Sequence, residues 1–437
     1  MATLESTPSL PQESSKMGGG GRLTKTLFRS ISSKEPSFSE LLFSPARLST
    51  SDVDPPIPSI SPLSPLPPSI ATKHEKFRST HQCISSMLKK DGRILSIAVI
   101  NGLIYTGSES NCIRIWKLPE FTECGRLQTK SGMVCALAVS SDRIFAAYAD
   151  CKIRVWRRLW HDKPSHVRIA TIPKIGSYVR NYITGGKDKK MMKHLGAISS
   201  LAVNASDDLL YSASIDKTVK VWRISDLKCI ETIEAHSEPI NAVAVGDDGV
   251  LYTASDDATI RVWRRNFCSS DRPHSLTVTL PAKNSPVKAL ALTADGGVLY
   301  GGCTDGYIHY WLKGWLSGQL QYGGALSGHS HAVMCLSSVA NYVVSGSADS
   351  TSRVWMRERD GQHTCLTVLQ GHRGPVKCVS AFTSDRGGGG GAGDCEDRCT
   401  VCTGSLDGVL KLWQVTCITS TNVARNSKQS GHDYFDL

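Results

Sequence analysis

The chain has 437 residues, of which 40% are apolar, and a formal net charge of +11. This length suffices for one large or several small domains, and the positive charge permits an acidic partner such as nucleic acid, a phosphoprotein or anionic lipid without identifying one. No run of 18 apolar residues occurs, so we expect no membrane-spanning helix.

The N-terminus lacks the charged start and apolar run of a secretory signal peptide. Its serine content resembles an organellar transit peptide, but Glu5, Glu13, Glu35 and Glu40 argue against one, because such peptides are poor in acidic residues. Without a secretion signal, the 15 cysteines are expected to be buried, reduced thiols of a protein of the cytoplasm and nucleus.

Residues 1–75 are predicted to form a disordered arm. The stretch PPIPSISPLSPLPPSI (55–70) favours extended conformations and cannot form a packed core. Ser44, Ser61 and Ser64 each precede a proline and are candidate sites of proline-directed phosphorylation, with a plain solvated tail as the alternative. Residues 421–437 are also expected to be a flexible tail.

Between the tails one segment recurs. YSASIDKTVKVW (211–222) and YTASDDATIRVW (252–263) match at most positions, and each unit holds four short runs with strand character separated by turn sequences. Four strands per unit of about 40–45 residues indicate a propeller blade, and the spread of spacings shows that two units carry insertions. The seven copies end at Trp116, Trp156, Trp222, Trp263, Trp311, Trp355 and Trp413.

On these repeats, residues 76–420 resemble the WD40-repeat family. The resemblance implies an all-β fold, a seven-bladed WD40 β-propeller with disordered N- and C-terminal tails. The insertion YVRNYITGGKDKK, the Pro/Ser-rich arm and the cysteine-containing repeat variants also resemble the plant JINGUBANG-like group of WD40 proteins.

A propeller must close its ring, because open blades would expose strand edges. The segment 81–99 aligns with 228–245, so its first run, His81–Leu88, precedes any blade of its own. We predict that this run forms the outer strand of the last blade, beside Leu410–Trp413.

Four units place a histidine four residues before the first apolar strand residue, and a Ser or Thr four residues before the turn aspartate. In WD40 families the matching residues form a buried chain from carboxylate through imidazole and hydroxyl to the indole N–H. A hydrolase would instead need an exposed hydroxyl and an oxyanion hole, so we expect internal bracing and no catalytic residue. The sets are His194–Ser212–Asp216–Trp222, His236–Thr253–Asp257–Trp263, His329–Ser345–Asp349–Trp355 and His372–Thr403–Asp407–Trp413.

Units 1, 2 and 5 lack this set. Ser110 replaces the turn aspartate in the first, Ala146 the hydroxyl in the second and Gly301 the hydroxyl in the fifth, and none has the histidine. We expect these blades to be held mainly by apolar packing and to open earliest.

Two further motifs resemble binding sites. CEDRCTVC (395–402) has cysteine spacing typical of metal sites, but zinc requires four ligands, and Cys399 and Cys402 should point to opposite faces of a strand. The glycine run 386–394 lacks the Lys-Ser/Thr of a phosphate-binding loop and is expected to be flexible. We expect no metal and no cofactor.

The insertion 174–193 interrupts the connection into the third blade and mixes basic with aromatic residues. It suits an acidic peptide or a nucleic-acid backbone, and a solvated loop is the alternative. Its candidate contact residues are Lys174, Tyr178, Arg180, Tyr182, Lys187, Lys189, Lys190 and Lys193.

Six of the seven units place Lys or Arg one or two residues after the closing tryptophan, among them Arg157, Arg158, Arg264 and Arg265. These cations could form a basic rim that docks an anionic surface, or be scattered and solvated. The acidic and basic residues that mark WD40 receptors of cullin-type ubiquitin ligases are missing after each tryptophan, which disfavours that role.

We therefore expect a non-enzymatic interaction scaffold, monomeric by itself, that binds proteins such as transcription regulators. Nucleic-acid or anionic-surface binding through 174–193 is the alternative, and an enzyme in the central channel is disfavoured because the inner strands are almost bare of acids and histidines. The family resemblance implies exposed partner-binding positions at Arg93, Leu95, Glu109, Pro239, Asn241, Asp256, Met334, Pro375 and Lys377.

Overall fold

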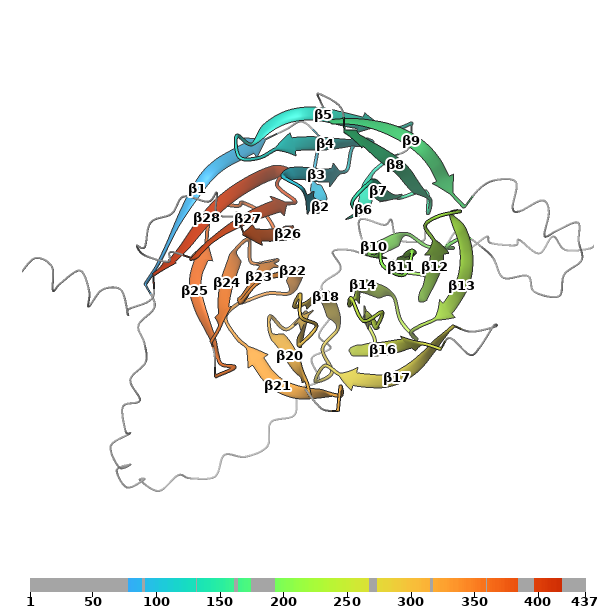
Figure 1. Ribbon diagram of the computed structural model, residues 1–437. Coiled ribbons are helices and arrows are strands. Elements are labelled where there is room, and N and C mark those ends of the chain that lie inside the picture. The colour runs from blue at the N-terminus through green and yellow to red at the C-terminus, as the bar shows by residue number, and fades with distance from the viewer. Residues whose placement is uncertain are drawn as a thin grey trace, which may run out of the picture. The chain divides into compact units, whose positions relative to one another are not determined.

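The computed structural model describes residues 78–88, 91–130, 132–160, 164–173, 193–266, 273–314, 317–358, 360–383 and 397–418. These residues lie in one compact unit, Ile60–Leu437. They form seven four-stranded antiparallel sheets, which are the blades of a ring (Figure 1). The all-β, seven-bladed propeller expected from the repeats is confirmed, and both tails expected from the sequence lie outside the described residues.

The blades follow the chain order. Blade 1 contains β2 (Ile94–Ile100), β3 (Leu103–Ser108), β4 (Cys112–Lys117) and β5 (Thr122–Gln128). Blade 2 contains β6 (Val134–Val139), β7 (Arg143–Tyr148), β8 (Ile153–Trp160) and β9 (Pro164–Ile172). Blade 3 contains β10 (Ile198–Asn204), β11 (Leu209–Ser214), β12 (Thr218–Arg223) and β13 (Lys228–Glu234). Blade 4 contains β14 (Ile240–Val245), β15 (Leu251–Ser255), β16 (Thr259–Arg265) and β17 (His274–Pro281).

The second half of the ring repeats this plan. Blade 5 contains β18 (Val287–Leu292), β19 (Val298–Cys303), β20 (Ile308–Lys313) and β21 (Leu320–Leu326). Blade 6 contains β22 (Val333–Val339), β23 (Tyr342–Ser347), β24 (Ser352–Arg357) and β25 (His363–Leu369). Blade 7 contains β26 (Val376–Thr383), β27 (Asp397–Ser405), β28 (Val409–Ile418) and β1 (Arg78–Leu88).

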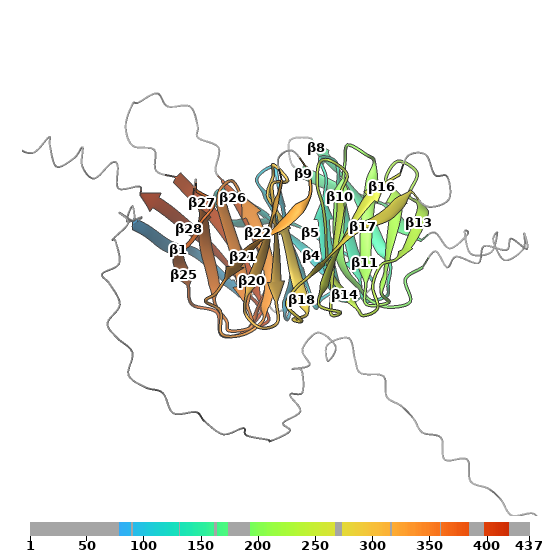
Figure 2. The ribbon, with the colours of Figure 1, turned by 90° about the horizontal axis from the view of Figure 1, so that it is seen from below.

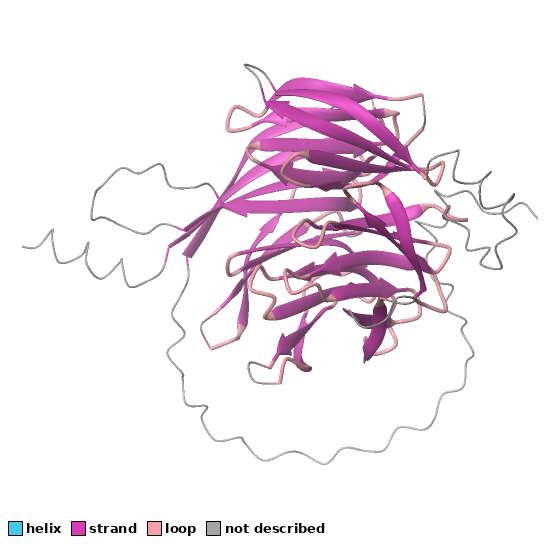
Figure 3. Cartoon of the chain, turned by 45° about the vertical axis from the view of Figure 1, so that its right-hand side comes forward, coloured by secondary structure: helices cyan, strands magenta, loops and turns pink. Residues whose placement is uncertain are grey.

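The first strand of each blade lies nearest the centre of the ring and contacts the first strands of both neighbouring blades. Seen edge-on, the strands run between two open faces of the ring (Figure 2). The described residues consist of strands joined by loops (Figure 3). No helix among them is long and apolar enough to cross a bilayer.

The ring is closed by the N-terminal strand. β1 pairs antiparallel with β28 and places Cys83 opposite Trp413 and Met87 opposite Leu410. This confirms the predicted position of His81–Leu88. The pairing covers the edge of β28, which would otherwise offer unpaired backbone groups to another chain.

The core consists of seven apolar clusters, each shared by two neighbouring blades. In each cluster, the tryptophan that ends the repeat packs against the preceding blade. Trp222 of blade 3, for example, lies among Phe145 and Ile153 of blade 2. Burying one such aromatic side chain stabilises the fold by about 1.5–3 kcal/mol, which explains why every repeat keeps the tryptophan.

The turn between the second and third strands of a blade is built by local hydrogen bonds. In blade 3, Ser214 Oγ accepts the Asp216 amide at 3.1 Å, and Asp216 Oδ1 accepts the Thr218 amide at 3.0 Å. Lys217 between them has a φ of 71°, a left-handed conformation that such turns need. We call the side of the ring that carries these turns the aspartate-turn face; its turn aspartates are Asp150, Asp216, Asp257, Asp305, Asp349 and Asp407.

Candidate functional site

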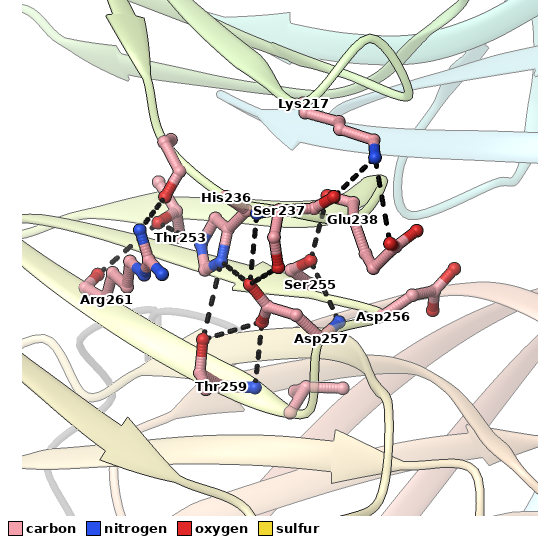
Figure 4. Close-up of polar contacts among 12 residues, drawn as sticks. Lys217, His236, Ser237, Glu238, Thr253, Ser255, Asp256, Asp257, Thr259 and Arg261 are labelled. Atoms are coloured by element: carbon pink, nitrogen blue, oxygen red, sulfur yellow. Dashed lines mark hydrogen bonds and ion pairs between the residues drawn. The ribbon is translucent and has the colours of Figure 1, made fainter.

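In blade 4, four side chains predicted from the sequence form one hydrogen-bonded chain below the aspartate-turn face. His236 Nδ1 lies 2.8 Å from Asp257 Oδ2, and His236 Nε2 lies 2.8 Å from Thr253 Oγ1 (Figure 4). Trp263 Nε1 donates to the same hydroxyl at 3.0 Å. A neutral histidine protonated on Nδ1 satisfies every partner, because the hydroxyl then donates to Nε2 and accepts from the indole.

Blades 3, 6 and 7 contain the same arrangement. The imidazole–carboxylate distances are 2.9, 2.8 and 3.2 Å, and each imidazole Nε2 lies 2.8 Å from its hydroxyl. The indole N–H donates to that hydroxyl at 2.9, 3.0 and 2.9 Å. The structure therefore brings together all four sets of residues that the sequence analysis had singled out.

The charges within a set are fixed by burial and hydrogen bonding. Burial opposes ionisation of Asp257, but hydrogen bonds from Thr259 and His236 outweigh it and lower the pKa of the carboxyl. Burial lowers the pKa of His236, and the attraction of Asp257 only partly offsets this. An ionised aspartate beside a neutral histidine follows at neutral pH, which agrees with the hydrogen-bond pattern.

The hydroxyls of the four sets are inaccessible. Ser212, Thr253, Ser345 and Thr403 have no exposed surface. Each hydroxyl proton is directed to an imidazole and each oxygen also accepts an indole N–H, so a substrate cannot reach it in this structure. This geometry suits a brace inside each blade better than a nucleophile.

Blades 1 and 2, which we expected to be held mainly by apolar packing, also contain polar contacts. In blade 1 the indole of Trp116 still donates to Thr106 at 3.0 Å, and Arg114 forms ion pairs with Asp91 and with Glu123, the latter at 2.7 Å. In blade 2 Arg154 pairs with Asp150 at 2.7 Å. In both blades the basic residue two before the tryptophan is thus the partner of acidic groups, beside the apolar clusters that these blades share with their neighbours. The earlier opening of these blades stays a prediction.

A second polar contact joins neighbouring blades and was not foreseen. A tyrosine in the second strand of blades 1, 3 and 5 lies within hydrogen-bond distance of a histidine in the outer strand of the following blade. The sequence does contain a signal for this contact, because a histidine follows every second repeat tryptophan by 8–11 residues. The tyrosine that each histidine contacts lies about 60 residues earlier in the chain, so the sequence spacing did not identify it. The pairs are Tyr105–His166 at 3.0 Å, Tyr211–His274 at 3.2 Å and Tyr300–His363 at 2.8 Å.

Near the aspartate-turn face, the innermost strand of each blade contains one residue at a distinctive position. The first strand of every blade has a β-bulge after its first residue, where the register against the second strand shifts. A bulge redirects the extra side chain. We call these seven residues the mouth ring: Leu95, Cys135, Ser199, Asn241, Lys288, Met334 and Lys377.

Four members of the mouth ring, Leu95, Asn241, Met334 and Lys377, were named from the sequence; the other three share their offset from the strand start and were missed. Asn241 donates to Val287 O at 2.9 Å and to Asp256 Oδ1 at 2.8 Å. The same carboxylate pairs with Lys288. Asp256, another candidate, is therefore occupied by two neighbours within the ring.

Lys377 differs from Lys288 in its surroundings. Burial lowers the pKa of its ammonium, with opposing effects from the thiols of Cys335 and Cys378, and Lys288 lowers it further. Among the described residues, no carboxylate forms an ion pair with Lys377.

Other predicted contact residues are not available or not described. Arg93 and Glu109 bind each other, with Arg93 Nη2 2.5 Å from Glu109 Oε1 and the Arg93 amide 3.0 Å from Glu109 Oε2. Cys399 and Cys402 lie in two different apolar clusters, as expected for opposite faces of a strand. Apart from Lys193, the insertion candidates lie outside the described part of the chain: Lys174, Tyr178, Arg180, Tyr182, Lys187, Lys189 and Lys190.

Several cations expected on the opposite rim are engaged in contacts between or within blades. Lys313 of blade 5 pairs with Asp248 of blade 4 at 2.6 Å. Arg265 approaches Asp207, and Arg357 approaches Asp295, each at 3.9 Å across a blade boundary. Arg158 is buried and donates to backbone carbonyls of its own blade. A continuous rim of solvated cations is therefore not what the structure shows.

Comparison with known proteins identifies the repeats. The family model "WD domain, G-beta repeat" matches residues 185–223, 227–264, 274–311, 320–356 and 363–414, which fall in blades 3 to 7. Blades 1 and 2, which lack the buried sets, are not matched.

Similar segments occur in larger proteins. The chain is 31% identical to zinc finger CCCH domain-containing protein 17 of Oryza sativa subsp. japonica over 29% of its length. It is 29% identical to telomerase protein component 1 of Mus musculus over 49%, and 28% identical to WD repeat-containing protein pop2 of Schizosaccharomyces pombe over 47%. These alignments span 24%, 8% and 26% of the relatives' own lengths. With five repeats matched and seven blades observed, the chain is a WD40-repeat protein whose blades close into one β-propeller.

Proposed function

We propose that this protein is a non-enzymatic interaction scaffold that binds a partner protein segment at the mouth ring, in the cytoplasm and nucleus. WD40-repeat proteins generally act as interaction scaffolds and generally lack catalytic activity. The observation that carries the proposal is the mouth ring itself. The bulge falls at the same position of the innermost strand in every blade, at the end near the aspartate turns, and the seven residues differ in chemistry, as a specific binding surface requires.

The ring also favours one kind of partner. Asp256 pairs with Lys288, whereas Lys377 is half-buried and has no carboxylate partner among the described residues. A charged group in such surroundings gains most from an opposite charge supplied by a ligand. We therefore propose that the bound segment presents an acidic side chain to Lys377, flanked by an apolar group that contacts Met334. Leu95, which we expected to be exposed, is buried, with an exposed fraction of 7%.

Photo-crosslinking in cells tests this proposal. A photoreactive amino acid at Met334 of the full chain should yield adducts with a specific protein, identified by mass spectrometry. Lys377→Glu should reduce the adduct at least about tenfold, because like charges then face each other. Arg264→Glu is the control. It makes the same charge change on an exposed residue near the end of β16, away from the aspartate turn that precedes this strand, and should leave the adduct unchanged.

The proposal is wrong if Met334 gives no protein adduct above the level obtained from the position of Arg264. An adduct that survives Lys377→Glu would contradict the acidic-segment part while leaving the scaffold role intact. Adducts that contain nucleic acid instead of protein would favour the alternative function.

A further inference from the structure

Blade 5 contains a cluster of potential metal ligands on the aspartate-turn face. Cys303 at the end of β19, Asp305 in the following turn and His309 in β20 place one ligand atom each within 4.8 Å of one another. Cys303 and His309 are buried, with exposed fractions of 0% and 2%, whereas Asp305 is exposed. A thiol and an imidazole thus lie beneath a carboxylate that faces solvent.

Only one of the two ring nitrogens of His309 lies within hydrogen-bond distance of another described residue. Its Nδ1 lies 3.0 Å from the hydroxyl of Tyr322, whereas its Nε2 is buried without any hydrogen-bond partner among the described residues. Burying an unpaired polar nitrogen is unfavourable in either protonation form, so such atoms are rare in folded proteins. The orphan nitrogen belongs to the same side chain that the thiol and the carboxylate approach.

Comparison with the other blades shows how this cluster arises. The position of Cys303 is a serine in five other blades, namely Ser108, Ser214, Ser255, Ser347 and Ser405. The position of His309 is occupied by Arg or Lys in all six other blades: Arg114, Arg154, Lys220, Arg261, Arg353 and Lys411.

The turn aspartate of blade 5 also lacks its usual partner. Asp305 corresponds to Asp257, but Lys283 stands where blade 4 has His236, so no loop histidine occupies the carboxylate. Two substitutions have therefore brought a sulfur and a nitrogen donor next to a carboxylate without an imidazole partner. No other blade combines these three groups.

We propose that Cys303, Asp305 and His309 bind a Zn²⁺ ion. Cysteine sulfur, imidazole nitrogen and carboxylate oxygen are the ligands that zinc prefers, and three protein ligands leave one coordination position for water or for a group of a partner. The Tyr322 hydroxyl at Nδ1 holds the imidazole with Nε2 toward the ion, as outer contacts of zinc-bound histidines do.

Binding must release a proton. A cysteine thiol without a metal is protonated at neutral pH. Zn²⁺ displaces the thiol proton to solvent as the zinc–sulfur bond forms, and His309 binds as the neutral imidazole. The ammonium of Lys283 lies 5.3 Å from the centre of the Tyr322 ring, and its positive charge near the site disfavours Zn²⁺ binding.

Metal titration of the full-length chain tests the site. After chelation, Co²⁺ should give thiolate-to-cobalt charge-transfer and visible bands that saturate at one ion per chain, and Zn²⁺ should remove them. Calorimetry in buffers of different ionisation enthalpy should show about one proton released per Zn²⁺. Cys303→Ser and His309→Gln should weaken Zn²⁺ binding by at least about 100-fold, and Tyr322→Phe by about 10-fold.

The controls separate this site from the other thiols and from misfolding. Cys112→Ser removes a buried thiol of blade 1 and should leave the titration unchanged. Cys303→Ser restores the residue found in five other blades, and His309→Arg restores a residue found in four, so at least one should melt as a folded protein. Absence of a thiolate band, or equal binding by wild type and a folded variant, would overturn the proposal.

Discussion

The hydroxyl of Tyr211 in blade 3 lies 3.2 Å from His274 Nε2 in blade 4, and the other nitrogen of that imidazole, Nδ1, lies 2.5 Å from Glu231 Oε2. Glu231 and His274 are both buried. The three side chains form a polar chain across the boundary between two blades. The same tyrosine–histidine contact joins blade 1 to blade 2 and blade 5 to blade 6.

Removing the hydroxyl of Tyr211 should weaken the ring. Tyr211→Phe leaves His274 Nε2 buried without a partner, so the free energy of unfolding should fall by about 1–3 kcal/mol. Equilibrium denaturation followed by tryptophan fluorescence measures this. Tyr252→Phe is the matched control, because Tyr252 occupies the same position in blade 4 and its hydroxyl makes no hydrogen bond to another described residue. Equal losses of stability in the two variants would contradict the role of the contact.

The buried sets should contribute to stability according to how many partners each hydroxyl has. Thr253→Val keeps the side-chain shape but leaves both His236 Nε2 and the Trp263 N–H without a partner, so we expect a loss of about 2–4 kcal/mol. Thr106→Val in blade 1 affects the indole of Trp116 but no histidine, and should cost less. Thermal denaturation of both variants checks the order, and the reverse order would refute the brace.

The same burial predicts that the hydroxyls are chemically inert. A fluorophosphonate probe, which labels activated serines, should not modify Ser212 or Ser345 in the folded protein, because neither has exposed surface. Intact-mass spectrometry after incubation measures labelling. Any stoichiometric adduct at these residues would show that the sets are reactive.

The free energy of unfolding should decrease in two stages as the pH is lowered. The first loss begins as the pH falls through 6.5, the ordinary histidine pKa, because His236, His329 and His372 then gain protons in the unfolded chain while burial lowers their pKa in the fold. The second begins near 3.8, where the unfolded chain protonates Asp257, Asp349 and Asp407, whose pKa is lowered in the fold. In both windows the unfolded state binds more protons, so the free energy of unfolding increases with pH.

Urea denaturation between pH 8 and pH 5 measures the first stage. His236→Gln should lower stability throughout but make its decrease with falling pH shallower, since one titrating histidine is gone. A constant free energy of unfolding from pH 8 to pH 5, or an unchanged slope in the variant, would contradict this account.

Closure by β1 should be essential to the ring. Deleting residues 1–88 exposes the edge of β28, so the truncated protein should aggregate or pair through that edge and lose its cooperative melting transition. Deleting residues 1–59 leaves β1 in place and should keep the melting temperature of the full chain. Light scattering and calorimetry distinguish the two, and a monomeric, cooperatively melting 89–437 fragment would disprove the role of β1.

The repeats alone predicted the number of blades, the strand order and the partner of the closing strand, because each depends on spacing that recurs seven times. They also singled out the recurring His, Ser or Thr, Asp and Trp positions, and the resemblance to WD40 proteins implied that these residues form four buried sets. In blade 3 the hydroxyl of Ser212 and the indole of Trp222 lie ten residues apart on adjacent strands, so their contact follows from the hairpin register. Contacts within one blade can therefore be predicted from the sequence, because they join residues of adjacent strands that are close along the chain.

Contacts between blades could not be obtained in this way. Whether Lys313 meets Asp248, or Tyr211 meets His274, depends on how closely and at what angle two sheets pack, and no period in the sequence records that angle. For the same reason several of the expected rim cations proved to be paired with an aspartate of the neighbouring blade.

The amino-acid sequence by itself thus determined the blades, because strand period, turn chemistry and the recurring tryptophan act over short stretches of chain. Only the tertiary structure decided which polar groups are satisfied and which remain available. Among the residues that the structure describes, Lys377 proved to have no carboxylate partner and His309 Nε2 no hydrogen-bond partner once the neighbouring side chains had been placed around them. Whether a polar group has a partner depends on the side chains that surround it in space, and many of these come from distant parts of the chain. Only the packed fold therefore decides which groups can still bind a ligand.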